Sequence, residues 1–329
     1  MTFSAPGTLR SLGRRAALVA AVSAALALPA ACGSGSTTTT SSPAGASGSA
    51  SPASSFPVTV QGANGALTLD QAPKKIVSMS PTATEMLFAM GAGPQVVAAD
   101  DNSTYPQEAP RTKLSAYQPN PEAVAGYAPD LVVVSNDTKG FVAALGKLQV
   151  PTLVLPAATT LDESYAQLRT LGTATGHAAE AATVAERTRG RIAAAVASVP
   201  KGASGDQPLK VYHELDQTYF SATSKTFVGS LYSLFGLQNI ADKAKGASGG
   251  YPQLSAEYVV SSAPDLIVLA DSKCCGQTPS KVGARPAFDD VPAVEKGRVV
   301  AVDDDVASRW GPRTADFAEA VAKALTAGT

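Results

Sequence analysis

The stretch Glu122-Ala-Val-Ala-Gly-Tyr-Ala-Pro-Asp-Leu-Val-Val-Val134 decides the fold, because it recurs without a gap as Glu257-Tyr-Val-Val-Ser-Ser-Ala-Pro-Asp-Leu-Ile-Val-Leu269. In both copies a glutamate begins a short predicted helix, Ala-Pro-Asp ends it, and an apolar run follows. Proline disfavours helical geometry in the residue before it, which explains the stop. An apolar run without polar alternation is typical of a parallel strand covered on both faces. The repeat therefore predicts two α/β units of one local design.

The segments around the first copy predict an α/β lobe. Further strand-like runs lie at residues 75–80, 96–99 and 152–155. Pro81–Met90 is predicted to be a helix, with Thr82 and Glu85 spaced as a capping box. Val58–Val60 and Leu67–Leu69 predict a β-hairpin across Asn64-Gly65, with a loop longer than the tightest type.

The middle of the chain is predicted to be helical. Residues 161–199 are rich in Ala, Glu, Arg and Gln and predict one or two helices, the second of them long. A break at residues 201–205 follows, and a strand is predicted again at residues 211–215. We therefore predict an α/β fold of two Rossmann-like lobes, residues 56–176 and 201–329, joined by a single long α-helix over residues 177–200.

The N-terminus is predicted to direct export and anchoring. Arg10, Arg14 and Arg15 precede an apolar run that is too short to span a membrane, and small residues then lead to Cys32. This pattern predicts a lipoprotein signal over residues 1–31 with Cys32 as the lipidated residue, although Pro29 stands where such signals usually have leucine. Ordinary secretion is the alternative. Residues 32–55 are uncharged and lack aromatic side chains, so they are predicted to be a disordered tether.

The charge balance argues against a nucleic-acid partner. The full chain has 26 basic and 27 acidic residues, and without the three signal arginines 23 basic residues remain, for a net charge of −4. A nucleic-acid-binding surface needs an excess of basic residues.

Five segments together resemble the Fe/cobalamin periplasmic-binding family of ABC-transporter receptors. They are KKIVSMSPTATEMLFAMGAG (74–93), NPEAVAGYAPDLVVV (120–134), TFVGSLYSLFGLQNIAD (226–242), LSAEYVVSSAPDLIVLAD (254–271) and PAFDDVPAVEKGRVVAVDDD (286–305). No single segment is diagnostic, but their order and spacing are specific, and the match runs from about residue 75 to residue 325.

The resemblance implies a receptor that binds a ferric siderophore or a cobalamin-like chelate in an interlobe cleft and delivers it to an ABC permease and ATPase complex. It implies a monomer that is held on the outer face of the cell membrane by a lipid anchor and contains no cofactor. It also implies that Glu122 and Glu257 contact the permease, although glutamate in a first helical turn is favoured by the helix dipole alone. A stiff linking helix implies a cleft that is largely preformed.

Loops at the strand ends are expected to line the cleft, because open α/β sheets bind ligands beyond the carboxyl ends of their strands. In the first lobe this rule selects Ser80, Asp101, Asn102, Tyr105 and Asn136. In the second lobe it selects Glu214, Asp216, Tyr219, Phe220, the run from Asp271 through Lys273 and Cys274 to Cys275, and Arg309, Trp310 and Arg313.

Trp310 is the only tryptophan and lies between two arginines. An aromatic ring beside a guanidinium is suited to contact a macrocycle face and its anionic groups. The alternative is that Trp310 only covers the last helix. Asp303-Asp304-Asp305 is expected to be a solvated turn and helix cap.

Direct binding of a metal ion is not predicted, because His177 and His213 are the only histidines and do not form a ligand cluster. His177 is expected near a helix start and His213 in the core. Cys274 and Cys275 are predicted as a tentative vicinal disulfide in an oxidising compartment, with free thiols or an intermolecular bridge as alternatives. The Cα atoms of adjacent residues lie about 3.8 Å apart, which strains such a bond.

Two other classes of function remain as alternatives. A surface lipoprotein hydrolase lacks support, because the chain has no phosphate-binding glycine loop after a strand and no histidine-rich zinc motif. A structural envelope lipoprotein would bind no small ligand. Among chelates, Arg309 and Arg313 favour an anionic ligand whereas Asp101 and Asn102 do not, so the sequence leaves the chelate open.

Overall fold

The computed structural model describes residues 55–200 and 207–327. The predicted export signal, Cys32, the tether up to residue 54 and the predicted break at residues 201–205 lie outside the described residues. Within the described part no helix has both the length and the apolar character needed to cross a membrane.

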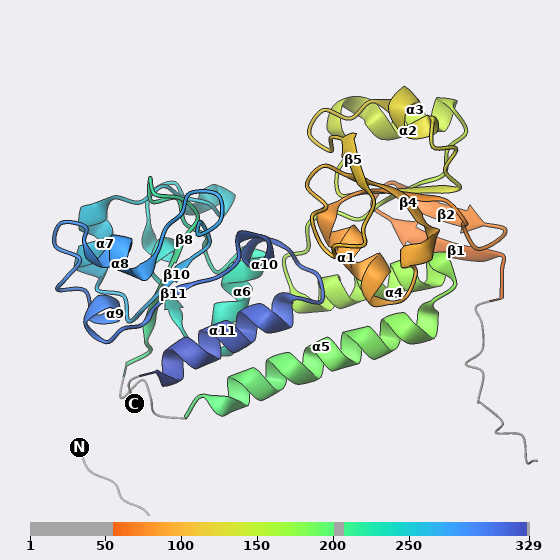
Figure 1. The fold of residues 1–329 in the computed structure, drawn as a ribbon. Helices are drawn as coiled ribbons and strands as arrows, with labels where there is room; N and C mark the ends of the chain where they lie inside the picture. The colour runs from red at the N-terminus through yellow and green to blue at the C-terminus, as the bar shows by residue number, and fades with distance from the viewer. Residues whose placement is uncertain (1–54, 201–206, 328–329) are drawn as a thin grey trace, which may run out of the picture. The chain divides into compact units, whose positions relative to one another are not determined.

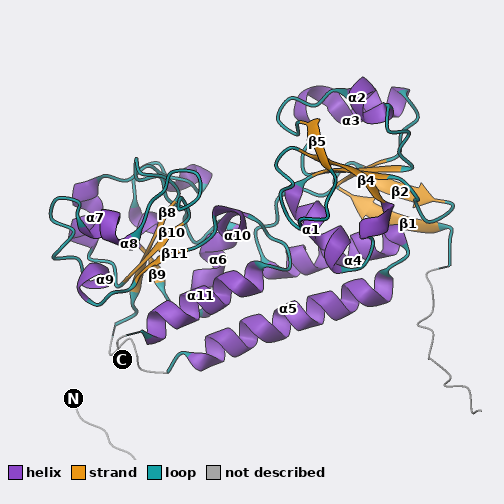
Figure 2. Cartoon of the chain, viewed as in Figure 1, coloured by secondary structure: helices purple, strands orange, loops and turns teal. Residues whose placement is uncertain are grey.

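The first lobe is built on a five-stranded parallel sheet with helices on both faces (Figures 1 and 2). Its strand order is β5-β4-β3-β6-β7, and Val77 of β3 pairs with Val132 of β6 at the centre. Both residues are completely buried, as expected for a strand covered on two sides. The elements are β3 (Ile76–Met79), α1 (Pro81–Ala89), η1 (Gly93–Gln95), β4 (Val96–Asp100), β5 (Arg111–Leu114), α2 (Pro121–Ala125), β6 (Leu131–Val134), η2 (Thr138–Gly140), α3 (Phe141–Lys147) and β7 (Thr152–Val154).

The second lobe repeats this design on a four-stranded parallel sheet of order β11-β10-β8-β9. Apolar clusters fill both faces of this sheet, one around Phe317 and one around Phe288. Its elements are β8 (Lys210–Glu214), α6 (Phe227–Leu234), β9 (Gln238–Asn239), η3 (Ile240–Lys243), η4 (Ala247–Gly249), α7 (Ala256–Ser262), β10 (Leu266–Leu269), α8 (Pro279–Gly283), α9 (Pro292–Glu295), β11 (Val299–Ala301), α10 (Asp304–Ser308) and α11 (Thr314–Thr326).

The predicted hairpin is present, but its loop is shorter than expected. β1 (Val58–Gly62) pairs with β2 (Gly65–Leu69), and Gly62 and Gly65 face each other across a two-residue loop. Asn64 in that loop donates to the carbonyl of Thr152 (2.8 Å) and accepts from the amide of Val154 (3.0 Å). The loop is tight because Asn64 binds the edge of β7.

The two copies of the repeat have the same backbone design. Asp130 accepts from the amides of Lys74 and Lys75, and Asp265 accepts from the amide of Lys210, so each aspartate holds the start of the neighbouring central strand. The residue before each proline leaves the right-handed helical conformation, as expected, and Ala128 and Ala263 both have a φ of 48°. This left-handed turn ends each helix and directs the chain into the strand.

Helix α1 begins at Pro81 as predicted, but its N-cap differs from the predicted one. Ser80 is the N-cap and accepts from the amide of Ala83 (3.4 Å), and Pro81 occupies the first helical position. The predicted capping box of Thr82 and Glu85 is therefore wrong, which leaves the Glu85 carboxylate free for other partners.

Two helices lie between the two sheets in the chain, and the second is the predicted long helix. α4 (Leu161–Thr175) ends at Gly176, which has a φ of 83°, and α5 (Ala178–Ser198) packs against α4 and then α11. Gly172 allows the close approach of α4 and α5, because a Cβ there would lie 2.4 Å from the Cβ of Ala181. Figure 1 shows α5 running along both lobes.

Helix α5 contributes to both halves of the fold. Its first part buries Val184 in the core of the first lobe, and its second part buries Ile192 against α11. Arg191 also binds Asp316 (2.7 Å) and Glu319 (2.7 Å) of α11. The fold is thus two Rossmann-like lobes joined by one long helix.

Candidate functional site

The carboxyl edges of the two sheets meet where the lobes touch. Thr104, in the loop after β4, donates to the Asp305 carboxylate (2.9 Å), and Arg309 donates to the carbonyl of Asn102 (2.8 Å). Both Asp305 and Arg309 follow β11. Ligands of open α/β sheets bind beyond the carboxyl ends of the strands, so this seam is the candidate site.

A buried ion-pair cluster joins the lobes at this seam. The Glu85 carboxylate of α1 accepts from Arg309 (2.7 Å) and from Arg313 (2.5 Å and 3.0 Å). The side chains of Glu85, Arg309 and Arg313 are only 2%, 9% and 16% exposed. Arg309 also binds Asp305 (2.7 Å). Both arginines, predicted as partners for an anionic ligand, thus have carboxylate partners within the protein.

Glu85 is a residue whose role sequence reasoning missed. Glu85 is the only charged side chain of helix α1, and a helix whose other residues are mostly apolar is expected to be largely buried. A buried carboxylate needs a charged or hydrogen-bonding partner. The need for such a partner could have identified Glu85 as part of an ion pair. The spacing of residues along the chain does not reveal which arginines are the partners.

Trp310 lies between the lobes as part of the core. Its indole N–H donates to the side-chain oxygen of Gln167 on α4 (2.8 Å), and its ring packs against the core clusters of both lobes. Its carbonyl accepts from Ser164. This arrangement agrees better with the alternative that Trp310 covers a helix than with the prediction that it contacts the ligand.

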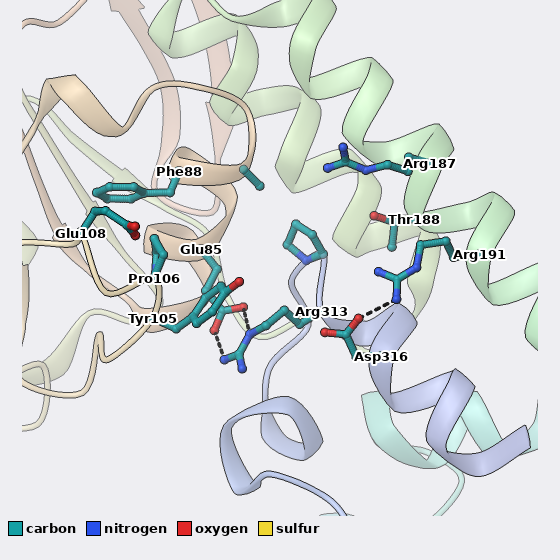
Figure 3. Close-up of a pocket in the computed structure, with 12 residues that line it drawn as sticks. Glu85, Phe88, Tyr105, Pro106, Glu108, Arg187, Thr188, Arg191, Arg313 and Asp316 are labelled. Carbon is teal, nitrogen blue, oxygen red and sulfur yellow. Dashed lines mark hydrogen bonds and ion pairs between the residues drawn. The ribbon is translucent and has the colours of Figure 1, made fainter. Parts of the chain in front are cut away.

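Next to the ion-pair cluster, a cavity of about 490 Å³ opens between α1, α5 and the loop before α11 (Figure 3). The charged side chains that line the cavity have no net charge. They are the three carboxylates of Glu85, Glu108 and Asp316 and the three guanidinium groups of Arg187, Arg191 and Arg313. Among the described residues, Glu108 and Arg187 have no ion-pair partner. The remaining lining residues are Phe88, Ala89, Tyr105, Pro106, Thr188 and Pro312.

Tyr105 is the predicted contact that lines this cavity together with Arg313. The Arg313 guanidinium lies 4.2 Å from the centre of the Tyr105 ring, and Tyr105 remains 45% exposed. The cation holds the ring in place while leaving part of it free for a ligand.

A second charged cluster lies inside the second lobe. Glu214, at the end of β8, is completely buried and forms two 2.6 Å hydrogen bonds with Arg285. Arg285 also donates to Gln277 (3.0 Å) and lies over the rings of Tyr219 (5.3 Å) and Phe288 (5.5 Å). Glu214 was predicted as a ligand contact, but its carboxylate is hydrogen-bonded to Arg285 inside the lobe. The prediction is therefore corrected.

Asp271 is buried beside this cluster, and neither of its carboxylate oxygens has a hydrogen-bond partner. Burial, and then the nearby Glu214 carboxylate, raises the pKa of Asp271 to about 7. In its neutral form Asp271 can share its hydrogen with Glu214, so the cluster of two acids and Arg285 carries no net charge at pH values below the pKa of Asp271.

Replacing Asp271 by asparagine is expected to reduce a loss of stability that occurs as pH rises from about 4 to 7. Because the folded-state pKa is above the unfolded value of 3.8, the folded protein holds the extra proton between about pH 4 and 7, and the free energy of unfolding falls as pH rises through that window. The free energy of unfolding of the Asp271→Asn variant, taken relative to that of the unchanged protein, should increase by about 2 kcal/mol between pH 5 and pH 8. Urea denaturation at both pH values measures this change. The 93% exposed Asp162, changed to asparagine, is the control and should show no such growth.

The other predicted contacts differ in their surroundings. Ser80 is buried as the cap of α1, so its prediction as a ligand contact is corrected. Asp101 and Asn102 are exposed and hydrogen-bonded to each other (3.0 Å). Exposed Asn136 accepts from Thr138 (2.8 Å).

The loop after β8 carries three more of these side chains. Asp216 accepts from Thr218 within its own turn, and Tyr219 contacts Arg285. Phe220 is 38% exposed. No contact joins these three residues to the ion-pair cluster among the described residues.

The cysteine loop packs against the start of α10. The amides of Lys273 and Cys274 donate to Asp304 (2.9 Å and 2.7 Å), and the Lys273 ammonium binds Asp305 (2.9 Å). Cys274 and Cys275 are free, exposed thiols, so the structure does not contain the predicted vicinal disulfide, consistent with the strain of a bond between neighbours.

Asp303 caps α10 as predicted, by accepting from the amides of Asp305 and Val306. The expectation of a solvated turn is wrong for its two neighbours. Asp304 holds the cysteine loop, and Asp305 binds residues of both lobes.

The described residues contain no group of three or more potential metal ligands. His213 is completely buried and lies 2.7 Å from the Tyr232 hydroxyl, and burial lowers the pKa of His213 to about 4. His177 is half-buried at the start of α5.

Glu122 and Glu257 occupy equivalent positions on the two lobes. Each is the second residue of a short helix, α2 or α7, whose N-cap is Asn120 or Ser255, and each side chain is exposed. Hydrogen bonds from its own backbone N–H and from Ser255 lower the pKa of Glu257. Neither glutamate has an ion-pair partner within the described part of the chain.

Comparison with known proteins places this fold among transport receptors. Residues 76–306 match the family model described as periplasmic binding protein. A cobalamin-binding protein of Halobacterium salinarum is 34% identical over 272 residues, which cover 80% of this chain and 73% of that protein. An uncharacterized ABC transporter substrate-binding lipoprotein of Bacillus subtilis, YvrC, is 29% identical, over 82% of this chain and 86% of that protein.

Among solved structures, the periplasmic vitamin B12-binding protein BtuF of Vibrio cholerae has a similar fold. The TM-score is 0.61 at 24% identity, and the alignment covers 77% of this chain and 96% of that chain. The shared fold, the family match over 76–306 and the relative at 34% identity lead to one conclusion. The chain belongs to the periplasmic binding protein family.

Proposed function

We propose that this chain is the substrate-binding protein of an ABC importer for a corrinoid such as cobalamin. It captures the corrinoid at the interlobe seam and delivers it to the permease without a catalytic step. A lipid on Cys32 holds it on the outer face of the membrane, and residues 32–55 serve as the tether.

The balanced charge of the interlobe site is the observation that carries this proposal. Arg309 and Arg313, the cations nearest the seam, are paired with Glu85, and the adjacent cavity has three acidic and three basic side chains. A strongly anionic ferric catecholate would need a surplus of cations to replace its hydration, whereas the unpaired Arg187 of the lining is matched by the unpaired Glu108. A corrinoid with amide side chains carries little net charge and matches a balanced, partly aromatic lining.

The names of relatives agree with this choice of ligand. The Halobacterium relative and a 29% identical protein of Pectobacterium carotovorum are named for binding cobalamin or vitamin B12. A corrinoid is larger than the cavity of about 490 Å³, so it would extend from the cavity across the strand-end loops. Exposed side chains of those loops, including Asn136 and Phe220, are then available as further contacts.

Calorimetric titration of the full chain tests the ligand. Cyanocobalamin should bind with one site and a Kd of about 1 µM or tighter, whereas a ferric catecholate should bind at least 10-fold more weakly. Tyr105→Ala should weaken cyanocobalamin binding about 10-fold, because truncating an aromatic contact costs roughly 1–2 kcal/mol. Tyr127→Ala, a similarly exposed tyrosine at the end of α2, is the matched control. Saturable binding of the catecholate alone would overturn the proposal.

A further inference from the structure

We propose that the cavity beside the ion-pair cluster binds a carboxamide side chain of the corrinoid, with Arg187 donating to the amide oxygen and Glu108 accepting from the amide N–H. This inference rests on the proposed corrinoid-binding function and adds a basis for selection to it. The receptor binds amidated corrinoids and discriminates against corrinoids that carry a carboxylate at the same place. Three features of the cavity support this selection, namely the pairing of its charges, the positions of the two unpaired groups, and the apolar surface between them.

Two of the six charged side chains in the cavity lining have no partner. The other four are bound to one another, in the pairs Glu85–Arg313 (2.5 Å) and Asp316–Arg191 (2.7 Å). Glu108 and Arg187 form neither an ion pair nor a side-chain hydrogen bond with any other part of the chain that the structure describes. The cavity therefore offers an entering ligand one free carboxylate acceptor and one free guanidinium donor.

These two groups come from different elements and face each other. Glu108 lies between β4 and β5, in a turn where the amide of buried Ala109 donates to the carbonyl of Pro106 (3.1 Å). Arg187 lies in the middle of α5, next to buried Thr188. Figure 3 shows the Glu108 carboxylate and the Arg187 guanidinium on opposite sides of the cavity, each turned toward its interior. The anchored turn and the helix hold the two charges apart, so the space between them is available to a ligand group.

The surface between the two charges is largely apolar. Phe88, Pro106 and Pro312 are partly buried there, and the Tyr105 ring is held by Arg313 at 4.2 Å. An apolar wall excludes part of the competing water. Hydrogen bonds from a ligand to the two ionised groups are therefore stronger than they would be on an open surface.

A primary carboxamide matches this arrangement. Its oxygen accepts hydrogen bonds, its nitrogen donates them, and it adds no charge to a lining whose charges balance. A carboxylate only accepts, so it would pair with Arg187 but leave Glu108 without a donor and place a second negative charge beside it. A site built to bind a ligand N–H discriminates against an analogue that lacks it, because the acceptor of the site is then left unpaired.

Calorimetry on the full chain tests this selection with cyanocobalamin and its monocarboxylic acid derivatives, each of which has one side-chain carboxamide replaced by a carboxylate. At least one derivative should bind about 10-fold or more weakly than cyanocobalamin, because it loses a hydrogen bond to a charged group and gains a like-charge contact. Glu108→Gln should bring the two affinities to within about threefold, because glutamine accepts from an amide and also donates to a carboxylate. Arg187→Gln should weaken cyanocobalamin binding about fivefold.

The matched controls are Glu180→Gln on α5 and Arg169→Gln on α4, whose exposed side chains do not line the cavity. Both controls should keep the affinity for cyanocobalamin and the preference for it.

Three results would overturn the inference while cyanocobalamin still binds and the proposed function stands. They are equal binding of every derivative by the unchanged protein, a preference that persists in Glu108→Gln, and an unchanged cyanocobalamin affinity in Arg187→Gln. Failure of the unchanged protein to bind cyanocobalamin contradicts the proposed function itself and this inference with it.

Discussion

Changing Glu122 and Glu257 together to lysine is expected to abolish uptake while leaving ligand affinity unchanged. Both carboxylates are exposed at the same position of equivalent helices, one on each lobe, and neither is paired within the described residues. If they contact basic groups of the permease, reversal of both charges replaces two attractions by two repulsions. Like charges at an interface cost several kcal/mol, so transport should fall at least 100-fold.

The measurement is uptake of labelled corrinoid by cells that carry the variant chain with its importer, together with calorimetry on the purified variant. A matched control is Glu180→Lys, because Glu180 is an exposed first-turn glutamate of α5 and loses the same helix-dipole stabilisation of about 0.3–1 kcal/mol. Glu180→Lys should transport normally. Normal uptake by the double variant would remove the docking proposal, because then both glutamates serve only their helices.

Glu85→Gln is expected to cause the largest loss of stability of any change discussed here. The substitution leaves the two guanidinium groups of Arg309 and Arg313, which are 9% and 16% exposed, with less negative charge at the seam. Breaking a buried ion pair from one side costs about 3–5 kcal/mol, because the remaining charge keeps its desolvation penalty. Asp305 partly compensates Arg309, so the loss should lie near 3 kcal/mol.

Urea denaturation measures this loss, and Glu186→Gln is the control. Glu186 pairs with Arg189 on the surface of α5 at 2.6 Å, with side-chain exposures of 66% and 44%. A surface pair contributes less than about 1 kcal/mol. Equal losses in the two variants would contradict the view that burial gives the Glu85 cluster its strength. Because Glu85 also joins the lobes, the variant should bind cyanocobalamin more weakly in calorimetry.

The local pattern of apolar and helix-forming residues was sufficient to predict most of the strands and helices. Continuous apolar runs placed the strands β3, β6 and β7 to within a residue or two, since a parallel strand buried on both faces leaves a signal in every residue. The same holds for α5, whose helix-forming composition extends over 21 residues. The Ala-Pro-Asp repeat predicted equivalent units because the same short motif forms the same left-handed turn in both copies, at Ala128 and Ala263.

The partners of the charged side chains required the tertiary structure. Glu85 lies 224 and 228 residues from Arg309 and Arg313, and Arg285 lies 71 residues from Glu214. Periodicity describes contacts within one helix or strand, and no local spacing encodes a pair at such separations. The strand-end rule therefore selected Arg309, Arg313 and Glu214 as free ligand contacts, when folding had already paired them.

The sequence by itself determined the elements, their order and the equivalence of the two lobes, because backbone turns and burial on both faces depend on neighbouring residues. Only the tertiary structure decided which charges neutralise one another and which polar groups remain at the seam. The physical reason is that burial of a charge is tolerated only beside its partner. That partner is brought near because α1 packs on α4, α4 on α5, and α5 on α11, and not by the chain between them.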